Sequence, residues 1–191
     1  MKRKNFGPAP GIFPMPVLIA ATYNENGTIN TMTAAWGQLC HRHKIALFLD
    51  ETHKTAQNIK ATQAFTVGIA DMQHLKEADY FGTVSGNDVA DKFIKSKMAA
   101  VKSTYVYAPV LTELPVVMEC KLEEIIHNDY MYCVIGDIVN MSASENVLDE
   151  KGAIDPLKLN VLLYDEFHAE YYSHNVKVGK AFEAGSDYLK E

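Results

Sequence analysis

Short apolar runs separated by turn signals constrain this chain more than any other feature. Residues 45–49 (IALFL) and 64–70 (AFTVGIA) have the length and composition of buried strands. Residues 24–27 (NENG) are typical of a hairpin turn, because Asn-Gly suits positive φ. These runs do not alternate regularly with long helices, which disfavours a doubly wound parallel sheet. The pattern predicts a mainly β chain, a mostly antiparallel β-barrel with a few peripheral helices.

Hydrophobic periodicity gives approximate bounds for each element. Strands are expected over residues 17–22, 28–30, 45–49, 64–70, 118–123, 132–139, 160–164 and 169–172. Helices are expected over residues 56–63, within 72–81 and over 88–98. Apolar and charged residues alternate over 118–123, which predicts one face exposed to water. Gly136 within a strand predicts a bulge.

Composition and charge exclude several classes of function. The chain has 191 residues, of which 48% are hydrophobic and 22% charged, as expected for one globular domain. Its net charge of −6 argues against a nucleic-acid partner, because no basic excess offsets the phosphates. Cys40, Cys120 and Cys133 cannot all pair within the chain and show no CxxC spacing. A reducing compartment is the simple inference.

The N-terminus loosely resembles a signal peptide, because residues 2–4 (KRK) precede apolar residues. Four prolines interrupt that apolar stretch: Pro8, Pro10, Pro14 and Pro16. The stretch is therefore too broken to serve as a signal peptide, and no run is long enough to span a membrane. We expect a cytoplasmic protein that does not associate with membranes.

A polar loop over residues 50–58 (DETHKTAQN) joins an expected strand to an expected helix. The hydroxyl of Thr52 or Thr55 is expected to cap that helix. The N–H groups of its first turn then point outward at the positive end of the helix dipole. Together with His53 and Lys54, this end suits a phosphate. The alternative interpretation is an ordinary capped helix with a solvated lysine.

Residues 30–37 (NTMTAAWG) are small or polar and end on the only tryptophan, Trp36. Small side chains let a ligand approach the backbone, while asparagine and threonine offer hydrogen bonds. The alternative interpretation is a core strand with an aromatic residue at its end.

Motifs for unaided catalysis are missing from the sequence. It contains no GxSxG, GxGxxG or Walker loop. His41 and His43 lie on the same side of an extended chain, but no third metal ligand is evident. If the protein is an enzyme, we expect a bound cofactor to supply the difficult chemistry.

Three segments of the chain form a pattern by their order and spacing. They are Asn24-x-x-Gly27-x-x-Asn30-x-Met32-Thr33-x-x-Trp36, then Thr52-x-Lys54-Thr55-x-x-Asn58-Ile59 with Phe65-x-Val67, then Ser85-Gly86-x4-Asp91-Lys92-Phe93. Together they resemble the flavin reductase-like family, and flavoredoxin-type proteins in particular. The resemblance extends from about Phe13 to Phe182.

The resemblance implies a single flavin reductase-like domain over residues 1–191, folded as an FMN-binding split β-barrel of antiparallel Greek-key type. It also implies a homodimer with the flavin near the subunit interface. The residues implied around the FMN phosphate are Thr52, His53, Lys54 and Thr55. Those implied along the ribityl chain and isoalloxazine ring are Asn30, Thr33, Ala34, Ala35 and Trp36. Those implied to close the site are Ser85, Gly86, Lys92 and Phe93.

The Lys92 ammonium would favour electron density on a reduced flavin. For Lys92 the alternative is a solvated helix lysine, and for Phe93 a core contact. Many relatives carry a histidine where this chain reads Asn128-Asp129-Tyr130-Met131, and the nearest histidine here, His127, lies slightly early. The residues of the late chain that are expected to approach the flavin are Tyr164, Phe167 and His168.

The implied function is that of a flavoprotein oxidoreductase, in which NADH or NADPH passes hydride to flavin N5. An alternative is a flavin-binding electron carrier that receives electrons from a protein partner and has no nicotinamide site. A third hypothesis is a barrel that binds another small ligand without redox chemistry. No catalytic residue and no metal ligand is assigned.

Overall fold

The computed structural model describes residues 2–9, 11–173 and 176–184. Pro10, one of the prolines that interrupt the apolar N-terminal stretch, lies outside the described residues, as do both ends of the domain expected over 1–191. Among the described residues, no helix is both long and apolar enough to cross a membrane.

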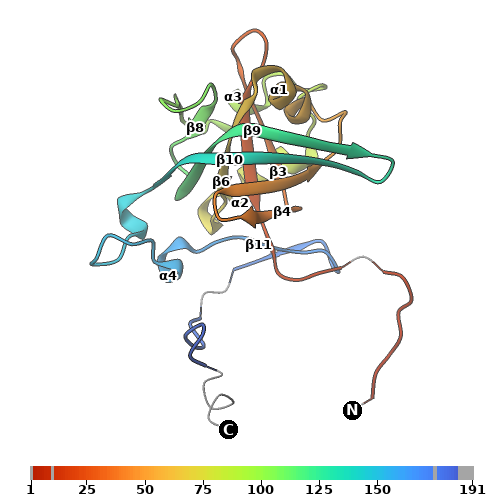
Figure 1. Cartoon of the computed structure of the whole chain (residues 1–191), viewed down its shortest axis with the longest axis vertical. Helices are drawn as coiled ribbons and strands as arrows, with labels where there is room; N and C mark the ends of the chain where they lie inside the picture. Colours follow the sequence, from red (N-terminus) through yellow and green to blue (C-terminus); the bar gives the residue numbers. More distant parts are fainter. Residues whose placement is uncertain (1, 10, 174–175, 185–191) are drawn as a thin grey trace.

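A seven-stranded antiparallel sheet forms the barrel (Figure 1). Its strands, in spatial order, are β3 (Ile29–Ala34), β2 (Leu18–Tyr23), β6 (Ala64–Ile69), β9 (Val116–Asn128), β10 (Met131–Ala143), β5 (Lys44–Leu49) and β4 (Gly37–His41). The two edge strands, β3 and β4, are separated in sequence only by Ala35 and Trp36. The sheet must therefore curl until its edges approach each other. This confirms the prediction of a mainly β, antiparallel barrel.

The seam between the two edges is closed by a tight approach at Gly37. A Cβ at this position would lie 2.7 Å from Leu47 Cδ2 and 2.9 Å from Leu18 Cδ1. Nearby, the Phe48 amide donates to the Trp36 carbonyl oxygen at 2.8 Å. Glycine at the start of β4 lets Leu47 of β5 and Leu18 of β2 pack closely beside the two residues that link the edges.

Strand β2 is buried on both faces, which explains why its sequence reads as a continuous apolar run. Leu18 and Ala20 belong to the core inside the barrel, together with Phe65 and Leu47. Ile19 and Ala21 belong to a second core cluster outside the barrel, which also includes Phe81. The second cluster fixes the helices against the barrel.

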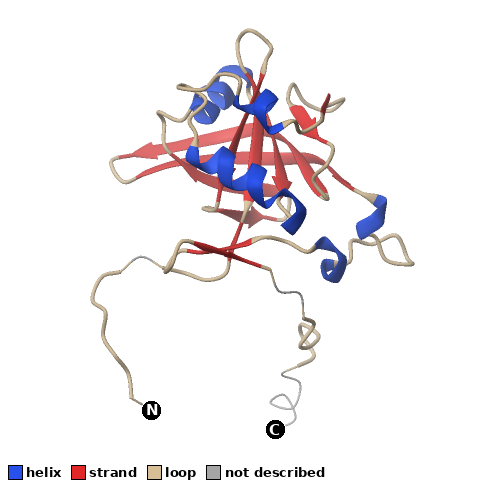
Figure 2. Cartoon of the chain, turned by 180° about the vertical axis from the view of Figure 1, so that it is seen from behind, coloured by secondary structure: helices blue, strands red, loops and turns tan. Residues whose placement is uncertain are grey.

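The helices and short 3₁₀ turns lie outside the barrel (Figure 2). They are α1 (Lys54–Thr62), η1 (Met72–His74), α2 (Leu75–Thr83), α3 (Lys92–Ser96), η2 (Glu145–Val147) and α4 (Pro156–Leu159). The prediction of a helix over 88–98 is wrong at both ends, because α3 extends only from Lys92 to Ser96. The amides of Asp88 and Val89 both donate to the Ser85 carbonyl oxygen, which makes a turn there, and Lys97 ends α3 with φ 62°.

Two small sheets complete the fold. One contains β1 (Met15–Pro16), β11 (Leu163–Asp165) and β12 (Glu170–Tyr172), and it lies at the end of the barrel nearest to both termini (Figure 1). The other contains β7 (Ala100–Lys102) and β8 (Pro109–Leu111). Tyr164 and Tyr171 of the first sheet pack against the outer core cluster, so this sheet closes one side of the helical layer.

Strand β9 departs from the expected alternation at one residue. Lys121 and Glu123 are exposed as predicted, but Glu119 is buried. Its carboxylate accepts hydrogen bonds from Ser103 Oγ and from Asn140 Nδ2, which covers that part of the strand. The bulge expected at Gly136 lies on the opposite strand: Ile135 pairs with Glu124 and Gly136 with Leu122, so the extra residue is Glu123 of β9.

Candidate functional site

A cavity of about 230 Å³ lies where α1 begins, between that helix, β3 and the end of α2. We call it the α1 cavity. Its lining residues are Met32, Thr33, His53, Lys54, Thr55, Phe81, Gly82, Thr83, Val84, Ser85, Gly86 and Lys92. All three segments on which the family resemblance rests contribute to it.

The first turn of α1 has no side-chain cap. His53 is the N-cap residue and makes no capping hydrogen bond. Thr52, expected as the cap, instead donates through its hydroxyl to Asp50 Oδ1 at 2.6 Å. Thr55 Oγ1 accepts from Asn30 Nδ2 at 2.8 Å. The predicted cap is therefore wrong, because a carboxylate and an amide engage both hydroxyls, and the first-turn amides stay available to a ligand or water.

Glycine at position 86 allows three segments to meet at this end of the helix. A Cβ on Gly86 would lie 2.0 Å from Asn30 Oδ1 and 3.2 Å from Lys54 Cβ. One residue later, Asn87 Nδ2 donates to the Thr52 carbonyl oxygen at 2.8 Å. The loop after α2 is thus held directly against the start of α1.

Lys92 is buried, with 2% of its surface exposed, and lines the α1 cavity. Its ammonium donates to the carbonyl oxygens of Val84, at 2.6 Å, and Phe81, at 3.5 Å, at the end of α2. Burial lowers the pKa of this lysine from 10.5 to about 8. The alternative of a solvated helix lysine is therefore wrong, and the cavity wall contains a fixed cation near neutral pH.

A second cavity, of about 320 Å³, adjoins the first and shares Thr33, Gly82 and Thr83 with it. Its other lining residues are Val17, Ala35, Asp79, Tyr164, Ala169 and Tyr171. The Tyr171 hydroxyl donates to Asp79 Oδ1 at 3.1 Å, and burial together with this carboxylate raises the pKa of Tyr171 to about 12. We call the two cavities together the cleft. It runs from the start of α1 to the sheet containing β11 and β12.

The structure brings most of the predicted site residues to the cleft. Its lining includes Thr33, Ala35, His53, Lys54, Thr55, Ser85, Gly86 and Lys92. Asn30 lies behind Thr55, to which it donates, and Thr52 contacts the loop after α2 through Asn87.

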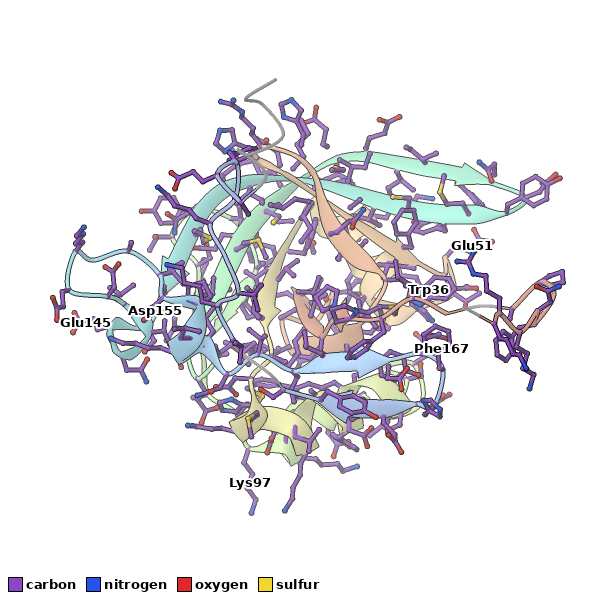
Figure 3. The ribbon with its side chains drawn as sticks, turned by 90° about the horizontal axis from the view of Figure 1, so that it is seen from below. Trp36, Glu51, Lys97, Glu145, Asp155 and Phe167 are labelled. Carbon is purple, nitrogen blue, oxygen red and sulfur yellow. The ribbon has the colours of Figure 1, made fainter. Side chains whose placement is uncertain are left out.

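Besides Asn30 and Thr52, three predicted residues do not line the cleft. Ala34 is buried in β3, and the Trp36 side chain is 58% exposed. Phe93 packs against the outer core cluster, as its alternative interpretation proposed. Figure 3 shows Trp36 on the same side of the molecule as Glu51 and Phe167, far from Glu145 and Asp155.

Sequence reasoning missed several lining residues, among them Met32, Phe81, Gly82 and Thr83. Met32 is next to Thr33, and Gly82-Thr83-Val84 precede Ser85, both of which were predicted to line the flavin site. Extending the predicted segments by one to three residues would have included them. Phe81 gave no separate signal, because an aromatic residue in an amphipathic helix is normally a core residue.

His127 and His168 lie outside the cleft lining. His127 Nε2 is 3.8 Å from Glu51 Oε2, and its ring packs edge-on against Tyr132. His168 Nδ1 lies 2.7 Å from Asp165 Oδ2, and this hydrogen bond raises the pKa of His168. Each ring is thus held by a carboxylate at the surface.

Comparison with known proteins gives consistent results. A family model described as "Flavin reductase like domain" matches residues 11–171. The flavoredoxin of Desulfovibrio vulgaris (Miyazaki F) is 30% identical, with a TM-score of 0.91 over 96% of this chain and 100% of that one. A flavoredoxin from Methanosarcina acetivorans is 23% identical, with a TM-score of 0.88 over 98% of this chain and 100% of that one. A search of curated proteins gave no match.

Proposed function

The chain belongs to the flavin reductase-like family, and from this premise we propose that it binds FMN in the cleft and acts as an oxidoreductase. One observation supports the proposal above all others. The first turn of α1 is uncapped and opens, beside Lys54 and Thr55, into a cleft long enough to continue to the tyrosines of β11 and β12.

The donors at the start of α1 fit a phosphate. Its free amides and the Lys54 ammonium would neutralise negative charge, and the Thr55 hydroxyl keeps its proton for a further hydrogen bond. His53 adds a ring nitrogen at the same rim, and Thr52 orders the loop through Asp50. These four residues would hold the phosphate of FMN.

The remaining assignments follow the cleft away from α1. Thr33 and Ala35 would border the ribityl chain and the ring, with Asn30 supporting Thr55 from behind. Ala34 and Trp36, whose side chains do not line the cleft, would contribute through backbone groups alone. Ser85, Gly86 and Lys92 would close the site, and Phe93 would support α3 from the core side. Bound FMN would supply the chemistry of hydride and electron transfer. The chain's own contribution is to bind the cofactor, orient it and keep a cation in the wall.

We propose NADH or NADPH as the electron donor. In the test, purified protein is loaded with FMN and the flavin absorbance is followed after anaerobic addition of each nucleotide. Bleaching is expected with at least one of them. A spectrum that stays oxidised with both would remove the reductase assignment while leaving FMN binding intact.

The second candidate is a flavin-binding electron carrier served by a protein partner. The similarity to two proteins named flavoredoxin and the 58% exposure of Trp36 favour it, because a surface aromatic suits contact with another protein. Such a carrier would show no turnover with NADH or NADPH alone, whereas a reductase would turn over without any partner.

We further propose a cytoplasmic homodimer. Several large apolar side chains are exposed on the described chain, among them Phe13, Trp36, Leu39, Phe48 and Phe167. A homodimer is what the family resemblance implies, and the dimer would cover those of these side chains that form one contiguous patch. The odd cysteine count supports a reducing compartment.

A further inference from the structure

A separate groove of about 530 Å³ lies on the other side of Lys54. Its lining residues are Tyr23, Asn24, Glu25, Lys54, Gln57, Asn58, Ala61, Thr62 and Tyr107. They come from the β2–β3 hairpin, the exposed side of α1 and the loop before β8. Because Lys54 lines both the cleft and this groove, the groove begins where the proposed phosphate site ends.

The groove offers an exposed aromatic face. The Tyr23 and Tyr107 rings pack with centroids 5.0 Å apart and planes tilted by 42°, and Tyr107 remains 50% exposed. Lys102 Nζ lies 5.8 Å from the centroid of the Tyr107 ring. The loop is fixed, since Ser103 Oγ accepts from the amides of Tyr105 and Val106. A rigid tyrosine with a neighbouring cation suits stacking with a nucleobase.

A hydrogen-bond acceptor lies in the same groove. Asn58 is 3% exposed, and its Nδ2 donates to Thr22 Oγ1 at 3.0 Å and to Asn24 Oδ1 at 2.8 Å. Both amide protons are therefore engaged, which fixes the orientation of the side chain. Its Oδ1 accepts no side-chain hydrogen bond from the described residues and stays available to an amino group such as that of adenine.

Charge and length also fit a nucleotide. Glu25 is the acidic residue of the lining, and a carboxylate suits the hydroxyls of a ribose while it repels a 2′-phosphate. From Lys54 to Thr62 the helix rises about 12 Å, the order of length of a phosphate and a ribose that lead to a base. Lys54 lies at the end of the groove that adjoins the cleft, where its ammonium can neutralise a phosphate bound between the two.

We propose that this groove binds the adenosine half of a dinucleotide whose other half lies in the cleft. The proposal rests on the proposed function for the flavin or nicotinamide half. FAD and NADH share this adenosine diphosphate chemistry. In either case Tyr107 stacks on the base, Asn58 accepts from it, and Glu25 accepts from the ribose.

The test compares FAD with FMN in binding titrations of wild-type protein and Tyr107→Ala. Loss of one base stack is expected to weaken FAD binding roughly 5- to 100-fold, while FMN binding is unchanged because FMN does not reach the groove. Tyr107→Phe should restore FAD binding. Tyr105→Ala is the matched control, because Tyr105 is exposed on the same loop but does not line the groove.

Two further measurements show whether FAD or NADH is the ligand of the groove. They also separate the proposal of an adenosine groove from the proposal that FMN binds in the cleft. If NADH is the ligand, Tyr107→Ala raises the KM for NADH in FMN-loaded protein and leaves FAD binding unchanged. ADP added to protein without flavin tests the groove even if FMN fails to bind, and it should bind wild-type protein more tightly than Tyr107→Ala. Equal binding of ADP, FAD and NADH to wild-type and Tyr107→Ala would overturn the proposal.

Discussion

The Lys92 ammonium is buried, and its hydrogen-bond partners among the described residues are two backbone carbonyl oxygens, those of Val84 and Phe81. Desolvation disfavours the charged form, which is why its pKa falls to about 8. The unfolded chain, by contrast, holds this proton up to the ordinary pKa of 10.5. Between these two values the unfolded state binds more protons, so Lys92 makes folding more favourable as the pH rises.

This predicts how Lys92→Met differs from wild type. The free energy of unfolding of wild type, minus that of the variant, should increase between pH 8 and pH 10.5, by at most about 1.4 kcal/mol per pH unit. Urea unfolding at several pH values measures this, and other titrating groups cancel in the difference. A difference that stays constant from pH 7 to pH 10 would show that Lys92 is solvated.

Gly86 is the second residue whose environment allows a sharp prediction. Gly86→Ala places a methyl group 2.0 Å from Asn30 Oδ1 in β3, so either the loop moves or the Asn30 side chain gives up its hydrogen bond to Thr55. We expect a loss of about 1–3 kcal/mol in the free energy of unfolding and weaker FMN binding. Gly82→Ala is the control, because its Cβ would lie 3.5 Å from Thr33 Cβ, an ordinary contact, within α2.

The control should be stabilised by about 0.5–1 kcal/mol, since alanine is the better helix residue. Urea unfolding of both variants without flavin gives the comparison. The close packing around Gly86 would be contradicted if both glycines tolerated alanine equally well.

At the scale of the element, the start of α1 could be stabilised further, because its N-cap residue, His53, makes no capping hydrogen bond. A cap at position 53 would satisfy the first-turn amides, which the structure leaves without a side-chain partner. His53→Asn and His53→Asp should each stabilise the flavin-free protein by about 1 kcal/mol. Both should weaken FMN binding, because the cap competes with the phosphate, and aspartate should weaken it more because it also adds negative charge.

Thermal or urea unfolding without flavin, followed by FMN titration, measures both effects in the same samples. A stabilised variant that binds FMN as tightly as wild type would mean that the phosphate is bound elsewhere.

The elements show where sequence reasoning succeeds. Strand β2 was predictable, because a continuous apolar run needs burial on both faces. The strand over 45–49 was also predicted as buried, but its Phe48 is exposed. The start of α1 was placed two residues late, at Ala56 rather than Lys54. Its cap was wrong, since the Asp50 carboxylate that engages Thr52 is itself a polar loop residue with no distinguishing signal. Tertiary partners also determine the burial of Glu119, because Ser103 and Asn140 come from distant parts of the chain.

The candidate site was predictable to a similar degree. The three segments that line the α1 cavity were identified because their order and spacing resemble the flavin reductase-like family. The second cavity was largely missed, since Tyr171 and Asp79 meet only when the short strands near the C-terminus fold back onto α2. Contacts of that range leave no periodic signal.

At the scale of the whole molecule, we expect the homodimer that the family resemblance implies. Each chain has a mass of 21.3 kDa, so light scattering during size-exclusion chromatography should give about twice this value. Leu39 is 60% exposed on the edge strand β4, and Leu39→Glu should lower the dimer fraction if this edge is part of the interface. A mass of one chain at micromolar concentration would remove the dimer.

The central claim is that the start of α1 binds the phosphate of a flavin. The most direct test compares the affinity of FMN with that of riboflavin, which lacks the phosphate, by quenching of flavin fluorescence. Wild-type protein should bind FMN at least roughly tenfold more tightly, and Lys54→Ala combined with Thr55→Ala should remove most of that difference. Equal affinity of wild-type protein for FMN and riboflavin would contradict the account.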